Sequence, residues 1–163
     1  MKDVTVYIRA AAEDERCIFC IFNAQEALLW KVYALEGAPE KMHITDREEQ
    51  PLLTIQPASL SLYPKYHVSV AGLERVRVVY KSGLSSNPTL TGAGWIILGE
   101  VCTGNYSVQD RDGKDVFRHE KKWGSVGEYV ELETSLSEHL LLSAGIAVAI
   151  DQTIVITPRV QPV

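Results

Sequence analysis

The sequence is short of cysteine, of long apolar runs and of excess positive charge. Its three cysteines are an odd number and cannot form a complete disulfide framework, so we expect a reducing, cytoplasmic setting. The longest uncharged apolar run extends from Leu140 to Ile150, whereas a membrane-spanning helix needs roughly 20 apolar residues. No apolar run of signal-peptide length follows the first residues. The net charge of −5 argues against nucleic acid as the main partner, because phosphate binding requires a dominant basic face.

The composition indicates a folded protein of ordinary size. Apolar residues make up 46% of the 163 residues and charged residues 23%, which is the balance of a soluble globular protein. A chain of this length can bury a core of its own. We therefore expect residues 1–163 to form one domain.

Short segments rich in β-branched and aromatic residues follow one another with no helix between them. In YHVSV, for example, Tyr66, Val68 and Val70 alternate with His67 and Ser69, as on a strand with two different faces. Many short strands without intervening helices predict an antiparallel sheet curled into a sandwich or barrel. The expected strands are VTVYI, CIFCIF, LLWKVY, MHIT, LLTI, LSLY, YHVSV, RVRVVY, GWIIL, NYSVQD and EYVELE.

One helix is expected near the C-terminus. Ser135 and Glu138 have the spacing of a capping box, and the residues that follow, HLLLSAGIAVAI, are apolar around the whole helix circumference. Such a helix must be surrounded by protein. The segment TIVIT, from Thr153 onward, is expected to be a last strand.

A barrel of about 8 strands is filled by its own side chains, so a barrel that encloses a helix needs more strands. These elements together therefore predict a closed or nearly closed barrel of about 12 antiparallel strands around the C-terminal helix. The small helix residues would keep the central helix slim. They are Ser143, Ala144, Gly145, Ala147 and Ala149.

An internal repeat supports this arrangement. The Asp-Arg pair at Asp46 recurs 64 positions later in the sequence (46 to 110). Nearly the same offset relates Trp30 to Trp95 and Tyr66 to Tyr129. Two similar strand meanders followed by the helix would explain it.

The second half resembles the LURP-one-related family, which shares the tubby C-terminal-like fold. The first half fits more loosely, through VYIR, LYPKYHVSV and ERVRVVYK. It lacks the D-x-x-G turn that members usually carry near the second strand, where this chain has FNAQEALLW, and His119 occupies an apolar position of the pattern. The matching residues are Trp95, Gly99, Glu100, Tyr106, Asp110, Gly113, Lys121, Lys122, Trp123, Tyr129 and Asp151, the last closing the apolar helix.

The resemblance implies a barrel of about twelve strands around a hydrophobic helix, in agreement with the strand pattern. It implies little about function. Short bacterial members are mostly uncharacterised, plant relatives are associated with defence responses, tubby proteins bind phosphoinositides through basic barrel residues, and the phospholipid scramblases are distant relatives. No enzymatic mechanism follows from it.

Cys17 and Cys20 have the C-x-x-C spacing of some redox and zinc sites. Residues three apart on a strand point to opposite faces, so we expect the two thiols not to converge. No helix follows Cys20, and no second pair of ligands completes a zinc site. We interpret both as structural thiols of a strand.

Two other patterns have structural interpretations. The segment DRDGKD has some acidic residues of a calcium loop, but Gly113 comes too early and Asp112-Gly113 is a hairpin turn signal. The histidines at positions 43, 67, 119 and 139 have no ligand spacing. We expect His119 to be a hydrogen-bonded interior residue, with a catalytic base as the alternative, and His139 to find a polar partner at the barrel mouth.

Asp151 lies at the C-terminal end of the apolar helix, where a negative charge is disfavoured by the helix dipole. We expect it to bond the backbone where the chain leaves the barrel.

The basic residues of two strands form a candidate surface for phosphates or anionic headgroups, if the strands lie close together. The alternative is an ordinary solvated face with ion pairs to neighbouring glutamates. The candidate residues are Arg75, Arg77, Lys81, Arg118, Lys121 and Lys122.

The sequence therefore favours a non-enzymatic binding or scaffold module with no cofactor, metal or catalytic residue assigned. The partner would be a protein or an anionic lipid surface, and the chain would then be cytoplasmic or peripheral to the membrane. An enzyme whose site assembles only in the fold is a further alternative. Any site should lie on the outer surface or at a barrel mouth, because the helix fills the interior.

Overall fold

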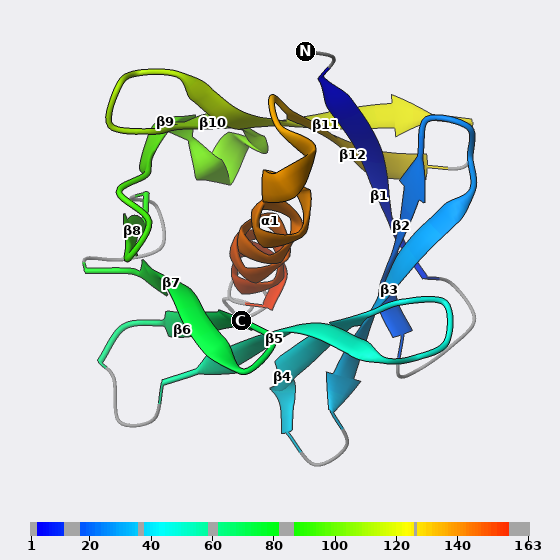
Figure 1. Ribbon diagram of the computed structural model, residues 1–163, viewed down its shortest axis with the longest axis horizontal. Helices are drawn as coiled ribbons and strands as arrows, with labels where there is room; N and C mark the ends of the chain where they lie inside the picture. The colour runs from blue at the N-terminus through cyan, green and yellow to red at the C-terminus, as the bar shows by residue number, and fades with distance from the viewer. Residues whose placement is uncertain are drawn as a thin grey trace, which may run out of the picture.

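A computed structural model describes residues 3–11, 17–35, 38–58, 62–81, 87–125 and 127–156. Within them, twelve strands form one antiparallel sheet that curls into a nearly closed barrel around one α-helix (Figure 1), as the sequence predicted. The strands are β1 (Val4–Ala10), β2 (Cys17–Asn23), β3 (Leu28–Leu35), β4 (Ala38–Thr45), β5 (Pro51–Pro57), β6 (Lys65–Val70), β7 (Leu73–Val79), β8 (Thr89–Thr91), β9 (Ile96–Glu100), β10 (Asn105–Gln109), β11 (Asp115–Gly124) and β12 (Gly127–Thr134).

The barrel is joined through its first and last strands. β1 pairs with both β2 and β12, and the sheet runs from β8 through β1 to β9. The two end strands, β8 and β9, are not neighbours in this ladder. The Asn87 side chain lies just before β8 and spans the seam: its amide donates to the Gly99 carbonyl over 2.6 Å and its oxygen accepts from Val101 N over 3.0 Å.

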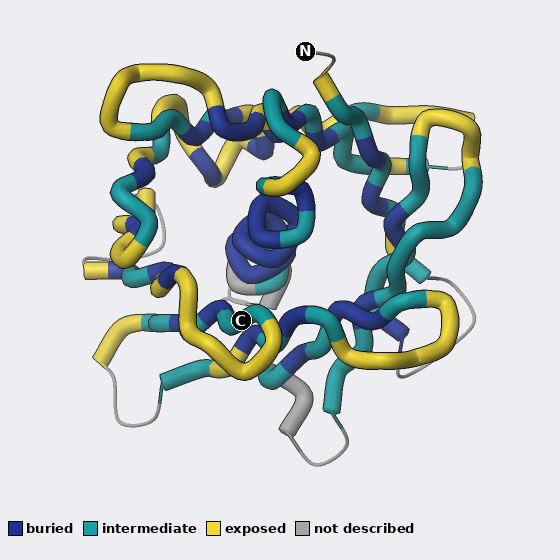
Figure 2. Tube along the Cα trace, viewed as in Figure 1, coloured by how far each residue is buried: buried dark blue, intermediate teal, exposed yellow. Residues whose placement is uncertain are grey.

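The helix α1 (Leu140–Ile156) passes through the barrel interior (Figures 1 and 2). Ala144 and residues 146–150 are fully buried, so the expectation of a helix enclosed on every side is confirmed. Gly145 permits the closest approach, since a Cβ there would come within 2.6 Å of Leu53 Cδ1 on β5. None of the helices in the described ranges is long and apolar enough to cross a membrane.

Both expected boundaries of the helix are wrong. A 3-10 turn, η2 (Ser137–His139), precedes α1, and Ser135 Oγ donates to the Asp115 carbonyl over 2.6 Å instead of capping the helix. At the other end the helix continues through Ile156, where the sequence suggested a strand from Thr153. A helix already formed extends at little cost per residue, and this outweighs the β propensity of Ile and Val.

The internal repeat corresponds to six strands. Asp46 follows β4 and Asp110 follows β10, and each carboxylate accepts two backbone N–H groups of its own turn over 2.9–3.0 Å. Asn23, the last residue of β2, forms the same turn. The left-handed position of these turns is filled by Gly113 (φ 79°) after Asp110, but by Glu26 and Glu49 (both φ 62°) in the first half. The first half therefore lacks the D-x-x-G sequence but forms the same turn with other residues.

The strand list needs three corrections. It omits β11 (Asp115–Gly124), although the candidate basic residues Arg118, Lys121 and Lys122 were expected on a strand. In LSLY, Leu62 and Tyr63 form a bend, and residues 60 and 61 lie outside the described residues. The short strand β8 had no clear pattern in the sequence, because three residues show too little alternation.

Candidate functional site

A buried ion pair lies between the barrel wall and the central helix. His119 is on β11 with its side chain inside the barrel and is 1% exposed. Its Nδ1 lies 2.8 Å from the Gly104 carbonyl oxygen, and its Nε2 lies 2.9 Å from Oδ2 of Asp151 on α1. Since a carbonyl oxygen can only accept, Nδ1 carries a proton and donates to Gly104. His119 is therefore the hydrogen-bonded interior histidine that the sequence predicted.

The partner of Asp151 differs from the one predicted. Asp151 was expected to bond the backbone at the exit from the barrel, whereas its carboxylate bonds the His119 imidazole. Burial alone would lower the pKa of His119. The charge and hydrogen bond of Asp151, together with the Gly104 carbonyl, outweigh burial, so the pKa of His119 lies above its ordinary value. The charged form of His119 is thus favoured inside the barrel.

Tyr106 holds the imidazole from one side. It pairs with His119 across β10 and β11, and the two rings stack with centroids 4.5 Å apart. Tyr106 is buried, its pKa is raised well above the ordinary value by burial and by Asp151, and its hydroxyl has no hydrogen-bond partner among the described residues.

Gly104 has a backbone conformation that suits glycine. It ends the 3-10 turn η1 (Val101–Thr103) with φ 84°, and a Cβ there would lie 2.9 Å from Lys121 Cβ. Gly104 therefore allows its carbonyl to reach His119 while β11 passes close by.

A pocket of about 120 Å³ opens beside the His119–Asp151 pair, at the barrel end reached by Ala10 of β1 and Glu128 of β12. We call it the mouth pocket. Its wall is mostly apolar, and at its rim Lys121 Nζ lies 2.9 Å from Glu128 Oε1. The lining residues are Ile8, Ala10, Phe19, Val101, Cys102, Gly104, His119, Lys121, Glu128, Tyr129, Val130 and Asp151.

The candidate basic residues do not lie on adjacent strands. Arg75 and Arg77 are on β7 and Lys81 follows it, whereas Arg118, Lys121 and Lys122 are on β11, with β8, β9 and β10 between them across the barrel seam. Lys121 also differs from its neighbours by facing the mouth pocket.

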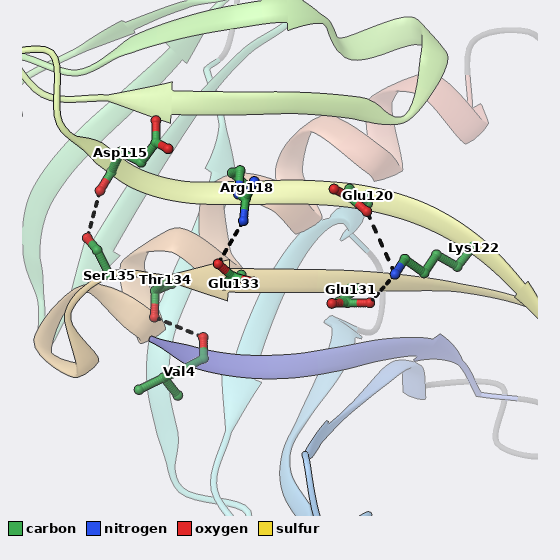
Figure 3. A network of polar contacts seen from close by, with 9 residues as sticks. All are labelled: Val4, Asp115, Arg118, Glu120, Lys122, Glu131, Glu133, Thr134 and Ser135. Carbon is green, nitrogen blue, oxygen red and sulfur yellow. Dashed lines mark hydrogen bonds and ion pairs between the residues drawn. The ribbon is translucent and has the colours of Figure 1, made fainter. Parts of the chain in front are cut away.

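Most of these cations have carboxylate partners. Arg118 contacts Glu133 at 2.9 Å, and Lys122 lies 2.6 Å from Glu131 and 3.8 Å from Glu120 (Figure 3). On β7, the Arg77 hydrogen bond, followed by that of His67, lowers the pKa of Glu74 to about 2. Arg75 and Lys81 form no ion pair with the described residues.

The structure corrects the interpretation of the two nearby cysteines. Cys17 and Cys20 lie on β2 as predicted, but their sulfur atoms are 3.9 Å apart. The expectation that they cannot converge is wrong, because a β-bulge lies between them.

The remaining histidines are dispersed. His43 is on β4, and His67 on β6 contacts Glu74. His139 in η2 packs edge-on against Trp95 and lies 3.8 Å from Glu138. Among the described residues, no three His, Cys, Asp or Glu side chains group as metal ligands would. The DRDG segment forms the expected turn.

The apolar residues of the mouth pocket were not predicted from the sequence. Phe19 and Val130 belong to ordinary strand patterns, and nothing local distinguishes a residue that lines a void from one that fills a core. The polar pair of His119 and Asp151 is easier to recognise in the sequence. His119 at an apolar strand position and Asp151 at the end of the apolar run are two polar residues in one core, and buried charges are usually paired.

Comparison with known proteins supports the fold. No protein-family model matches the sequence. A Bacillus subtilis (strain 168) protein described as "Uncharacterized protein YxjI" is 28% identical over 140 residues, which is 83% of this chain and 85% of that protein. The X-ray structure of the Arabidopsis thaliana protein AT5G01750 matches with a TM-score of 0.63 at 13% identity, over 93% of this chain and 91% of that one. The likeness to the Arabidopsis structure shows a shared barrel fold.

Proposed function

We propose that this chain is a non-enzymatic binding module of the LURP-one-related type, and that the mouth pocket binds a compact, mostly apolar molecule bearing a hydroxyl group. The sequence motifs from Trp95 to Asp151 and the fold shared with the Arabidopsis protein support the family. The ligand is inferred from this chain alone.

The mouth pocket is the observation on which the proposal depends. Its volume of about 120 Å³ is close to that of apolar cavities of ~150 Å³ that bind benzene. Ile8, Phe19 and Val130 provide apolar wall. A single ring, or the end of a longer amphiphile, fits these dimensions.

Asp151 selects the polar group of the ligand. Its Oδ2 is used by His119, and within the described part of the chain its Oδ1 accepts no hydrogen bond. A carboxylate oxygen accepts strongly from a hydroxyl group. An anionic ligand would be repelled by the same carboxylate, and the Lys121–Glu128 pair leaves little net charge at the rim.

The engagement of His119 supports a binding role over catalysis. Cys102 also lines the pocket, so a thiol, an imidazole and a carboxylate lie near one another. A catalytic histidine, however, needs a free nitrogen to take the nucleophile's proton. Both ring nitrogens of His119 are already bonded, to Gly104 and Asp151.

The proposal is tested by NMR titration of the protein with phenol, toluene and benzoate. We expect phenol to bind more tightly than toluene, with backbone shifts centred on β1, β11 and β12, and benzoate to bind least. Ala10 is exposed and lines the pocket, so Ala10→Phe should block phenol without disturbing the core. Leu73→Phe, at an exposed position of β7, is the matched control and should bind normally.

Two results would overturn this proposal. One is phenol binding that Ala10→Phe leaves unchanged. The other is hydrolysis of 4-nitrophenyl acetate that depends on both His119 and Cys102, which would indicate an enzyme.

Peripheral recognition of anionic lipid is the second candidate. Trp123 is 77% exposed on the β11–β12 hairpin beside Lys122, and Arg75 and Lys81 are without ion pairs to described residues. Co-sedimentation with neutral and anionic vesicles at low and physiological salt tests it. Salt-sensitive binding that is lost in Arg75→Ala/Lys81→Ala and in Trp123→Ala would support this candidate. An equal lack of binding to both vesicle types at low salt, where attraction is strongest, would exclude it.

A further inference from the structure

Two thiols are brought together on the outside of the barrel by an irregularity in β2. Cys17 pairs with Tyr33 of β3, Phe19 with Val32, and Cys20 with Lys31. Three steps along β2 thus match two steps along β3, so an extra residue is accommodated at Ile18, as in a β-bulge. Cys17 and Cys20 therefore face the same side of the sheet.

The distance between the sulfur atoms permits reaction between them. They are 3.9 Å apart, whereas a disulfide bond is ~2.05 Å long, so rotation of the side chains and a small adjustment of the backbone at the bulge must close the rest. The contact is fixed by strand pairing on both sides of the bulge, because Cys20 also pairs with Arg9 of β1. The two thiols cannot drift apart while the sheet is intact.

The surroundings of Cys17 and Cys20 give the two thiols different roles in a reaction. Cys17 is 4% exposed, while Cys20 is only partly buried. An external reagent therefore reaches Cys20 first. Lys31 lies directly opposite Cys20 on β3, and its pKa is raised, mainly by Tyr33 and further by both cysteines. Its positive charge is thus close enough to interact with a thiolate on either sulfur.

We infer that Cys17 and Cys20 are a redox-active pair that forms an internal disulfide by exchange with a low-molecular-weight disulfide. The Cys20 thiolate attacks one sulfur of the reagent, forming a mixed disulfide and releasing one thiolate. Cys17 then loses its proton and attacks Cys20 Sγ, which releases the second thiolate. Two protein thiols are oxidised and one small disulfide is reduced to two thiols.

A metal site explains the pair less well. A structural zinc ion needs four ligands, and no third His, Cys, Asp or Glu among the described residues joins the two sulfurs in a ligand group. The residues opposite Cys20 on the two neighbouring strands, Lys31 and Arg9, are both cations, which would oppose a bound metal ion.

The experiment treats the reduced Cys102→Ser protein with oxidised glutathione. Trypsin cuts after Arg16 and Lys31, so both cysteines fall in one peptide. After alkylation of the remaining thiols, we expect this peptide to be lighter than its reduced form by two hydrogen atoms and unalkylated. The internal disulfide should exceed the glutathione adduct by about tenfold or more, because the second thiol is held in place. Dithiothreitol should restore both thiols.

Single variants define the order of attack. In the Cys102→Ser background, Cys17→Ser should accumulate glutathione on Cys20, and Cys20→Ser should react much more slowly. The inference is overturned if the Cys102→Ser protein keeps both thiols reduced, or if it stops at a stable adduct on Cys20. In the wild type, exposed Cys102 should form an adduct under the same conditions, which confirms that the reagent is active.

Oxidation of Cys17 and Cys20 should also change the shape of the mouth pocket. Phe19 lies between the two cysteines in β2 and lines that pocket, so contraction of the bulge would move part of the pocket wall. We expect phenol to bind the oxidised and reduced proteins with different affinities. This last step depends on the proposed function, whereas disulfide formation does not: if phenol fails to bind either form, the proposed function is wrong and the peptide masses still decide the redox pair.

Discussion

His119 Nε2 and Asp151 Oδ2 lie 2.9 Å apart, although the two residues are 32 positions apart in the sequence. This bond ties the wall of the barrel to the helix inside it. The other fully buried side chains described on α1 are apolar except for Ser143. The pair therefore fixes the rotation and depth of the helix in a way that smooth apolar packing cannot, and the mouth pocket takes its polar wall from the same two side chains.

Removing one partner should destabilise the fold. Asp151→Ala leaves His119 Nε2 buried without its acceptor, and an unsatisfied buried polar group costs about 1–3 kcal/mol. Urea denaturation measures this loss. Glu133→Ala, which breaks the exposed pair with Arg118, is the control and should cost less than about 1 kcal/mol. Equal losses in the two variants would contradict a special role for the buried pair.

The pair should make stability depend on pH. Because the folded-state pKa of His119 is raised above the ordinary value of 6.5, the contribution of the pair is complete below pH 6.5. It is lost as the pH rises through the folded-state pKa. The difference in unfolding free energy between wild type and Asp151→Asn should therefore shrink over that range.

The imidazole signals of His119 provide a direct check. In Asp151→Asn, burial is no longer opposed by a carboxylate charge, so the pKa of His119 should fall below its wild-type value. An unchanged NMR titration midpoint would mean that Asp151 does not hold the proton on His119.

Two glycines with similar backbone angles should respond differently to alanine. Gly104 and Gly113 have φ values of 84° and 79°, but a Cβ at Gly104 would meet Lys121 at 2.9 Å, whereas nothing lies within 4 Å of one at Gly113. Gly113→Ala should cost about 1 kcal/mol from backbone strain. Gly104→Ala should cost about 1–3 kcal/mol more from overpacking. Thermal unfolding of the two variants compares them, and similar losses would show that Lys121 moves aside freely.

The turns of the first half should be improved by glycine. Glu49 has φ 62° in the turn begun by Asp46, a conformation that costs an L-residue roughly 1–2 kcal/mol. Part of this gain is offset by the greater freedom of glycine in the unfolded chain, so Glu49→Gly should stabilise by about 0.5–1 kcal/mol. Urea denaturation would detect it. The neighbouring Glu48→Gly, at a position without positive φ, should destabilise.

Much of the fold could be predicted from the sequence because many separate segments indicate the same architecture. Many short alternating segments and a helix apolar on all sides leave few arrangements other than a helix inside a barrel. The predicted repeat at Asp46 and Asp110 is also confirmed, since an aspartate that accepts two N–H groups of its own turn is a local feature.

The incorrect predictions depend on non-local geometry. Strand alternation placed Cys17 and Cys20 on opposite faces, but one extra residue in β2 reverses the parity, and nothing in CIFC marks it. Ser135 has the residue type and spacing of a helix cap, yet the Asp115 carbonyl competes for its hydroxyl. The partner of Asp151 could not be deduced because it depends on how deep the helix sits in the barrel.

The pairing of β1 with β12 has a consequence for how the chain acquires its structure during synthesis. Val4 aligns with Thr134, so one edge of β1 has no strand to pair with until nearly the whole barrel sequence has left the ribosome. The helix that fills the centre comes later still, at Leu140–Ile156. Contacts so distant in sequence are slow to form, and a wall of apolar faces cannot close around an empty interior. We therefore expect assembly to be late, with the helix organising the strands made before it, and nascent chains stalled before residue 140 should depend on chaperones.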